Sequence, residues 1–469
     1  MKAFASCLVV IAGLGGHAWS SEVIDIGSRR ELFVDRLLVG ELKGTTLRLH
    51  SPQPAPPVSP PRPNGHYATV LRAPDRFQFY YRGDKVPGAH WRNGWEAYHE
   101  GEVTLYAESP DGIRWTEPKL GLFEHPTFPK GNIVLMDEFL VNHNFTPFID
   151  TKPGVPEAER YKALGGLAYQ PHPEHLEVRG RRGPGGLNAY VSPDGIHWTK
   201  WREEPVIPEE WGKYFDSQNY AFWSESEQAY VCYFRRFIGG LRGIARTTSQ
   251  DFIHWTPYVE MQANLPGEHL YTACTQPYFR APHLYVALPT RFMDKRGAAT
   301  DILFMTTRPG ATHYDREFTE SLIRPGLGPD GWANRANYAA IGIHQTGESE
   351  MSIFLTGGRR YTLRLDGFAS VNAPLAGGEF LTKPLSFSGR ELEINYSTSA
   401  AGEVRVELQD AAGTPLPGFS LEEAEPIYGD HLARVVKWKG GSDLGALAGK
   451  PVRLRFVMSD ADLFSIRFR

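Results

Sequence analysis

With 469 residues, the chain is longer than a single compact core usually organises, so two domains are expected. Hydrophobic residues make up 41% and charged residues 22% of the chain, a composition that excludes a disordered protein. The 50 Lys and Arg residues against 54 Asp and Glu residues give a net charge of −4 without a basic stripe, so nucleic acid is not an expected partner.

The first twenty residues have the pattern of a cleaved secretory signal peptide. Lys2 precedes an apolar run over residues 3–16, and Ala18-Trp19-Ser20 ends in small residues at the spacing that signal peptidase prefers. A run of about 14 apolar residues is too short to span a bilayer. The mature protein is therefore expected to be secreted or periplasmic, without a membrane span.

Four segments repeat along the middle of the chain, with the pattern Ser-Pro-Asp-Gly-Ile-x-Trp in the clearest copies. They begin at Ser109, Ser192, Ser249 and, in a decayed form, Thr307, and each follows an alternating strand pattern. Asp-Gly is typical of a hairpin turn, and the Trp opens the return strand. With an aromatic-rich strand before each copy and a weaker unit near residues 339–357, the repeats predict a β-propeller of five blades over residues 21–358.

The pattern changes after residue 358. Strands such as Glu403–Leu408 and Val452–Phe456 alternate cleanly between apolar and polar residues, and the hairpin motif is absent. Such alternation is typical of half-exposed antiparallel strands. Residues 359–469 are therefore expected to form a β-sandwich accessory domain, and the whole chain belongs to the all-β class.

Polar residues that lead into the predicted inner strands are the candidates for catalysis, because a propeller usually carries its site at one mouth of the central channel. Asp216 lies in such a segment, and Glu268 has the matching position in the next blade. Two carboxyl groups from adjacent blades can flank one glycosidic bond, one as general acid and the other as base or nucleophile. The aspartates of the hairpin turns, Asp111, Asp194 and Asp251, are instead explained by the turns alone.

Other polar residues in the same segments or at strand ends are candidates for substrate binding. They can donate hydrogen bonds to hydroxyl groups or pair with an acidic substrate group such as sulfate or uronate. For each residue a purely structural role is the alternative. The set consists of His66, His143, Asn144, Asn219, Arg235, Arg291 and Arg335.

The sequence predicts no cofactor. It contains no Gly-rich phosphate loop, nucleophile elbow or His-Glu-x-x-His motif, and its 16 His residues are scattered. Cys232 and Cys274 lie in apolar strand patterns, which favours two buried thiols over a disulfide. A structural metal assembled from distant blades stays open.

Several segments carry a resemblance to known proteins: Glu31-Leu-Phe-Val-Asp35, the Ser-Pro-Asp-Gly hairpins, Phe215-Asp-Ser-Gln-Asn219 and Ala281-Pro-His-Leu-Tyr285. They resemble a group of secreted bacterial proteins that is similar to the five-bladed propeller glycosidases of glycoside hydrolase families 32, 43, 68 and 117. The resemblance implies three carboxyl groups, of which Asp216 and Glu268 match the second and third by their order along the chain. The first-blade segment around Asn64 has no acid, and Asp35 is a candidate substitute for it.

Two functions from different classes follow. The leading hypothesis is a secreted, exo-acting glycoside hydrolase with Glu268 as general acid and Asp216 as catalytic or substrate-orienting carboxylate, and with Glu320 and Glu350 in reserve. The missing first carboxylate favours the alternative, a carbohydrate-binding propeller without catalysis. A weaker alternative is a sialidase-like enzyme, for which the sequence gives no obvious arginine triad. Two carboxyl groups facing each other at roughly 5–10 Å would favour the enzyme.

Overall fold

The computed structural model describes residues 23–58, 66–83, 102–136, 141–167, 185–212 and 215–469. The predicted signal peptide and Asn64 lie outside the described residues. Within them the chain is almost entirely β-structure, as predicted, and its one α-helix is α2 (Glu209–Gly212). None of the described helices has the length and apolar character needed to cross a membrane. Short 3-10 helices span Glu157–Glu159, Asp294–Arg296, Asp330–Trp332, Thr356–Gly358 and Gly445–Leu447.

Five antiparallel sheets follow one another along the chain, and in each of them the first strand is extended by the strands that come next; the first and the fifth join at one edge into an eight-stranded sheet. The first contains β6 (Thr69–Arg72), β7 (Phe77–Gly83), β8 (Val103–Ser109) and β9 (Ile133–Leu135), and the second β10 (Thr146–Ile149), β11 (Tyr161–Gly165), β12 (Gly186–Ser192), β13 (Thr199–Lys200) and β14 (Ile207–Pro208). The third contains β15 (Tyr220–Ser224), β16 (Ala229–Ile238), β17 (Leu241–Ser249) and β18 (Val259–Glu260), and the fourth β20 (Thr275–Tyr278), β21 (Ala281–Ala287) and β24 (Met305–Thr307). The fifth contains β26 (Ala339–Gln345), β27 (Glu350–Leu355), β28 (Arg359–Arg364) and β5 (Gln53–Ala55).

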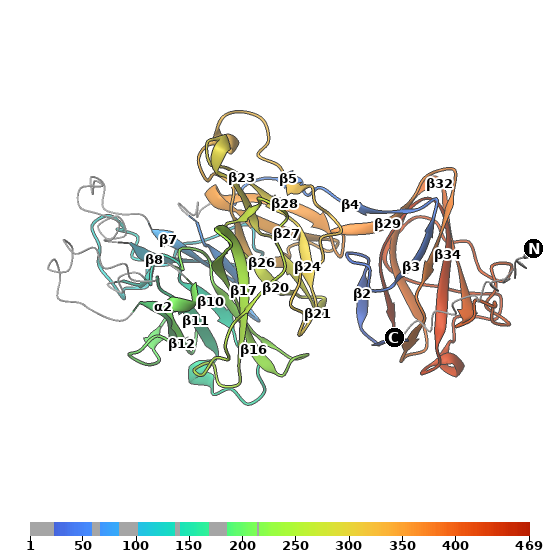
Figure 1. Cartoon of the computed structure of the whole chain (residues 1–469), viewed down its shortest axis with the longest axis horizontal. Coiled ribbons are helices and arrows are strands. Elements are labelled where there is room, and N and C mark those ends of the chain that lie inside the picture. The colour runs from blue at the N-terminus through green and yellow to red at the C-terminus, as the bar shows by residue number, and fades with distance from the viewer. Residues whose placement is uncertain (1–22, 59–65, 84–101, 137–140, 168–184, 213–214) are drawn as a thin grey trace, which may run out of the picture.

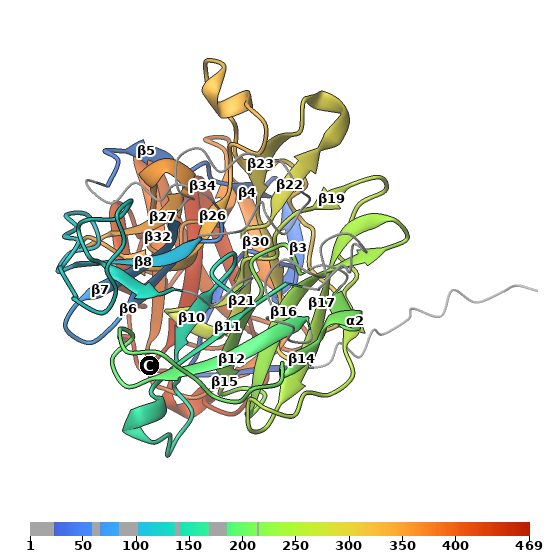
Figure 2. The same ribbon diagram turned by 90° about the vertical axis from the view of Figure 1, so that its left-hand side faces the viewer.

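The first strands of the five sheets form a closed ring. β6 contacts β10, and the contacts continue through β15, β20 and β26 back to β6. β26 and β6 pair in parallel where Ile341 faces Thr69. This lobe faces the viewer in Figure 2. A further small sheet of β19 (His269–Leu270), β22 (Thr290–Met293), β23 (Ala299–Leu303) and β25 (Ser321–Ile323) is inserted into the fourth unit.

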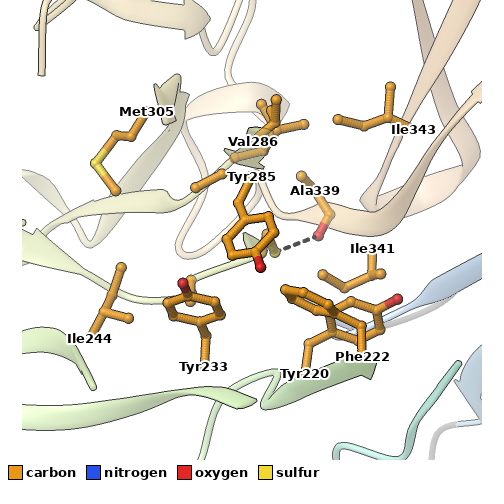
Figure 3. Packing of buried hydrophobic residues seen from close by; sticks show 14 of the residues in the cluster. Tyr220, Phe222, Tyr233, Ile244, Tyr285, Val286, Met305, Ala339, Ile341 and Ile343 are labelled. Atoms are coloured by element: carbon orange, nitrogen blue, oxygen red, sulfur yellow. Dashed lines mark hydrogen bonds between the residues drawn. The ribbon is translucent and has the colours of Figure 1, made fainter. Parts of the chain in front are cut away.

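Aromatic and aliphatic side chains fill the space between neighbouring sheets of the ring (Figure 3). The rings of Phe222 on β15 and Tyr285 on β21 meet edge to face, with centroids 5.0 Å apart. Cys232 and Cys274 are buried free thiols, as predicted. The Cys274 thiol lies 3.5 Å from the carbonyl oxygen of Ala339, so it contributes a contact between the fourth and fifth sheets.

The repeated hairpins are turns held by their own aspartates. In the second copy, Asp194 Oδ1 accepts hydrogen bonds from the backbone N–H groups of Ile196 and His197 at 2.8 and 2.9 Å. Asp111 and Asp251 accept the equivalent pairs. The prediction that these aspartates serve the scaffold is confirmed.

The pH dependence of stability tests this role at Asp194. Burial alone would raise the pKa of Asp194, but hydrogen bonds from the backbone and side chain of His197 and from the backbone of Ile196 lower it to about 2. Because the folded-state pKa lies below the unfolded value, Asp194 stabilises the fold fully above the unfolded pKa, and this contribution is lost as the pH falls toward 2. We expect Asp194→Asn to flatten the acid-side loss of stability, measured by urea unfolding at stepped pH. Asp330→Asn, at an exposed position, is the control, and an unchanged acid-side slope in Asp194→Asn would contradict the assignment.

The second lobe is a ten-stranded sheet to which both ends of the described chain contribute (Figure 1). Its longest strands, β32 (Leu392–Asp410) and β34 (Val452–Phe468), pair along most of their length. The N-terminal strands join it, because β2 pairs with β34, β3 with β30 and β4 with β29. The other strands are β1 (Ile24–Gly27), β2 (Arg30–Leu32), β3 (Val39–Lys43), β4 (Thr46–Leu49), β29 (Ala369–Ala373), β30 (Gly378–Thr382), β31 (Leu385–Phe387) and β33 (Asp430–Val435).

These pairings differ from the predicted division at residues 358 and 359. Residues 24–49, assigned to the propeller from the sequence, pair with C-terminal strands, whereas β28 (Arg359–Arg364), assigned to the sandwich, completes the fifth sheet beside β27 and β5. The reason is physical: alternation in a sequence shows that a strand is half-buried, but it does not show which sheet the strand joins.

Candidate functional site

Asp216 lies where the segments that lead into the five ring strands meet. Tyr67 Oη donates a hydrogen bond to Asp216 Oδ1 at 2.9 Å, and His143 Nε2 lies 3.1 Å from the same oxygen. Tyr271 Oη donates to Asp216 Oδ2 at 3.2 Å. The ring of Tyr338 is 6.0 Å from that of Tyr67 and 5.4 Å from that of Tyr271. Each of the five segments therefore contributes one residue to a single cluster.

Asp216 is an ionised carboxylate within reach of solvent. Burial by itself would raise its pKa, but the charge of Arg235, with Nη2 at 3.7 Å, and the hydrogen bonds from His143 and Tyr67 hold that pKa well below its usual range. The Asp216 side chain is 28% exposed, whereas Arg235 is 3% exposed. The cluster therefore exposes one negative charge, that of Asp216, while the residues that hydrogen-bond to Asp216 are buried.

A chain of polar contacts continues behind Asp216. His143 Nδ1 lies 3.1 Å from Glu102 Oε2, and Arg82 Nη1 lies 3.6 Å from Glu102 Oε1. Both His143 and Glu102 are buried. Carboxylates on both sides of the imidazole fix its plane, and the imidazole in turn orients Asp216.

Two of the predicted binding residues hold the backbone of the site. Asn144 Nδ2 donates to the carbonyl oxygens of Phe215 and Ser217 at 2.8 and 3.0 Å, and Asn219 Nδ2 donates to the same two oxygens at 3.0 and 2.9 Å. Phe215 has a φ of 45°, a left-handed conformation that costs a residue with a side chain about 1 kcal/mol or more. The two amides therefore fix a strained turn that aims Asp216, and their buried side chains serve position rather than substrate contact.

His66, Arg235 and Arg335, also predicted from the sequence, lie in the cluster. His66 stacks on Tyr338 with ring centroids 4.0 Å apart, and burial lowers the pKa of His66 to about 3, so its imidazole is neutral. Arg235 and Arg335 lie over Tyr271 at 5.0 and 5.5 Å from the ring centroid. Tyr67 and Arg335, with φ of 69° and 56°, add to the backbone strain around the site.

Glu268 lies in a separate ion pair. Arg316 Nη1 is 2.8 Å from Glu268 Oε2 and Arg316 Nη2 is 3.2 Å from Oε1, while the N–H of Leu265 donates to Oε2 at 3.1 Å. Within the described residues no contact joins Glu268 to Asp216. In the fourth segment, the residue that contacts Asp216 is Tyr271, three positions after Glu268.

The remaining candidates also lie outside the Asp216 cluster. Arg291 forms a two-pronged pair with Asp301, at 3.0 and 2.6 Å. Asp35 pairs with Arg308, the residue that also contacts Glu31. Glu320 is exposed, and Glu350 lines a groove of about 350 Å³ beside Arg364 and Phe464.

We expect Glu268→Gln to lower stability rather than turnover. Its buried carboxylate holds Arg316, so the change should cost about 1–3 kcal/mol of the free energy of unfolding. The turnover rate per folded molecule should stay within about threefold of wild type, because Asp216 keeps all of its partners. Urea unfolding and initial rates measure the two effects. A variant that is fully stable but inactive would instead restore Glu268 as the general acid.

Several residues of the cluster were not predicted from the sequence, namely Tyr67, Arg82, Glu102, Tyr271, Tyr338 and Arg242, whose guanidinium lies 4.9 Å from the Tyr271 ring centroid. Tyr67, Tyr271 and Tyr338 each stand up to four residues before a ring strand, so their shared position was a usable signal. Glu102 and Arg82 reach the site from neighbouring strands, which no local pattern shows. Among the described residues, no group of three or more His, Cys, Asp or Glu side chains could hold a metal ion.

No family model and no curated sequence matches the chain. Solved structures do match, among them one described as a glycoside hydrolase, at 14% identity and a TM-score of 0.44 over 67% of this chain and 91% of that chain. A Bombyx mori GH32 beta-fructofuranosidase matches at 10% identity and a TM-score of 0.41, over 90% and 94% of the two chains. A thermostable family-43 glycoside hydrolase matches at 11% identity and a TM-score of 0.40, over 67% and 92%.

These matches are glycoside hydrolases of the families that the sequence resembles, as predicted. With identities below 25% and TM-scores below 0.5, the function has to be argued from the site itself.

Proposed function

We propose that the protein is a secreted glycoside hydrolase that cleaves glycosidic bonds of an oligo- or polysaccharide at Asp216. One observation carries the proposal: three other segments that lead into ring strands place Tyr67, His143 and Tyr271 in hydrogen-bond contact with a single ionised, partly exposed carboxylate, that of Asp216. Glycosidases stabilise an oxocarbenium-like transition state with a carboxylate beside the anomeric carbon. A carboxylate whose pKa is held low suits the nucleophile or base rather than the general acid.

The surroundings of Asp216 suit a sugar. Buried polar atoms need partners, yet His66 Nδ1 and Tyr338 Oη have none among the described residues. A ligand rich in hydroxyl groups supplies both donors and acceptors to such atoms.

The proposed architecture is a five-bladed propeller followed by a β-sandwich accessory domain. The closed ring of β6, β10, β15, β20 and β26 supports the propeller, because each ring strand is followed by antiparallel strands that extend outward from it, although β6 and β26 also pair with each other. The long pairing of β32 with β34 supports the accessory domain. Secretion rests on the signal-peptide pattern of the first twenty residues.

A carbohydrate-binding protein without catalysis is the second candidate. The observation that favours it is the ion pair between Glu268 and Arg316, which leaves Asp216 without a second carboxylate in contact among the described residues. A site that holds a glycan needs the hydrogen bonds of the cluster but no general acid.

One screen separates the two candidates. Mature protein is incubated with plant and marine polysaccharides, and both new reducing ends and retained binding are measured in each sample. We expect new reducing ends with at least one substrate. Binding without cleavage across the panel would favour the second candidate, and neither binding nor cleavage would contradict both.

A further inference from the structure

Three guanidinium groups surround the ring of Tyr271 beside Asp216. The Arg235, Arg242 and Arg335 guanidinium carbons lie 5.0, 4.9 and 5.5 Å from its centroid. Arg235 and Arg242 come from the paired strands β16 and β17, and Arg335 comes from the segment before β26, far from them in the sequence. A cation over an aromatic face is stabilised by that face, but the N–H groups of a guanidinium lie in its own plane and still need acceptors.

Those acceptors are missing within the described residues. Nε and Nη1 of Arg235, Nε of Arg242 and Nε of Arg335 are buried and have no hydrogen-bond partner there. Arg235 is only 3% exposed, so water does not hydrogen-bond to its unpaired N–H groups as it would on a surface. Other arginines of the described chain also have an unpaired nitrogen, but most of them, such as Arg246 and Arg316, hold a carboxylate through their remaining nitrogens, whereas Arg242 and Arg335 hold none.

The charges are also unbalanced. The carboxylate that faces the three arginines is Asp216, which lies 3.7 Å from Arg235. Neither Arg242 nor Arg335 forms an ion pair in the described part of the chain. Three positive charges therefore face one negative charge. Burial and then the charge of Arg235 lower the pKa of Arg242, whereas, against the effect of burial, the nearby tyrosines and Asp216 raise the pKa of Arg235 and of Arg335. Holding like charges together in a partly buried site is costly unless an anion joins them.

We propose that Arg235, Arg242 and Arg335 bind an anionic substituent of the sugar, a carboxylate or a sulfate ester, next to the bond that Asp216 addresses. This inference rests on the proposed function and narrows its substrate class from any glycan to an acidic one. Carboxylate and sulfate oxygens match the planar fork of a guanidinium and accept two N–H groups at once. An anion here supplies the missing acceptors and balances the charge, while Asp216 keeps its own hydrogen bonds.

Binding is measured by isothermal titration in the Asp216→Asn background, so that recognition is independent of turnover. The probes are trigalacturonate, a sulfated galactan oligosaccharide and neutral galactotriose. We expect one acidic probe to bind at least about tenfold more tightly than galactotriose, with an affinity that falls as NaCl is raised. The stronger acidic probe identifies carboxylate or sulfate as the group that the site prefers.

Arg242→Gln and Arg335→Gln should each weaken binding of the preferred acidic probe by about tenfold, with less than about a twofold effect on galactotriose. Arg434→Gln, an exposed arginine on β33 in the other lobe, is the charge-matched control and should bind like its parent. Circular dichroism and Tm establish that each variant is folded.

The inference is overturned if no probe binds, if galactotriose binds as tightly as both acidic probes, or if folded Arg242→Gln and Arg335→Gln variants keep full affinity for the acidic probe. Turnover of neutral glycans by the wild type would then leave the proposed hydrolase standing. Conversely, selective acidic binding with no cleavage by the wild type would remove the hydrolase and keep the anion site.

Discussion

Asp216→Asn is expected to lower the turnover rate by at least about a thousandfold while the protein stays folded. The amide of Asn carries no negative charge. It can therefore neither form a bond to the anomeric carbon nor stabilise the positive charge that develops there in the transition state. It keeps the size of the side chain, so Tyr67, His143 and Tyr271 retain a hydrogen-bonding neighbour. Arg235 loses its counter-charge, which should cost about 1–3 kcal/mol of the free energy of unfolding.

Initial rates on a substrate found in the screen measure the first effect, and urea unfolding measures the second. Asp330→Asn removes the same charge from an exposed position and should leave both unchanged. A folded Asp216→Asn variant with the wild-type rate would show that Asp216 is not the catalytic carboxylate.

The sequence predicted the repeating scaffold well because its signal is local. Asp194 with its Ser-Pro-Asp-Gly turn is readable within seven residues, and the same turn recurs in other copies. Asp216 was also selected from the sequence, because it stands in a polar run directly before an apolar strand, and the structure places it in a hydrogen-bonded cluster. The outcome for Glu268 was different, because chain order gives the segment but not the direction of each side chain.

Insertion of β19 explains the difference at Glu268. His269 and Leu270 form this short strand beside β22, and it separates Glu268 from Tyr271. Glu268 is left at the outer end with Arg316, and Tyr271 reaches Asp216. The arginine cluster could not be predicted from the sequence either. Arg242 and Arg335 are separated by more than ninety residues, and only the folded ring of strands brings them together.

Asp366 links the two lobes and is the position where a single change should cost most stability. Its side chain is fully buried, and Oδ1 accepts a hydrogen bond from Tyr278 Oη of β20 at 2.9 Å. Oδ2 accepts from Asn395 of β32 and Ser465 of β34, at 3.1 and 2.8 Å. Arg30 and Arg280 approach the same oxygen at 3.5 and 3.4 Å. One carboxylate thus joins the fourth sheet of the ring to the ten-stranded sheet.

Asp366→Ala should destabilise the protein by about 3–5 kcal/mol, because it leaves buried arginines and hydroxyl groups without their shared acceptor. Asp366 also has a φ of 63°, a conformation that Ala adopts at a cost and Asn tolerates. Asp366→Asn therefore isolates the loss of charge, and we expect a smaller cost of about 1–3 kcal/mol. Urea unfolding followed by tryptophan fluorescence and by circular dichroism measures both variants.

The two lobes should also unfold less cooperatively once Asp366 is replaced. β4 and β29 pair with each other between the lobes (Figure 1), and their residues pack against both cores, so they would carry the coupling together with the ion pairs of Arg308 with Glu31 and Asp35. Separate transitions by the two probes would reveal the uncoupling. The control is Asp75→Ala, which removes an exposed ion pair with Arg76 and should have no measurable effect. If Asp366→Ala were as stable as this control, the buried carboxylate would not be what holds the lobes together.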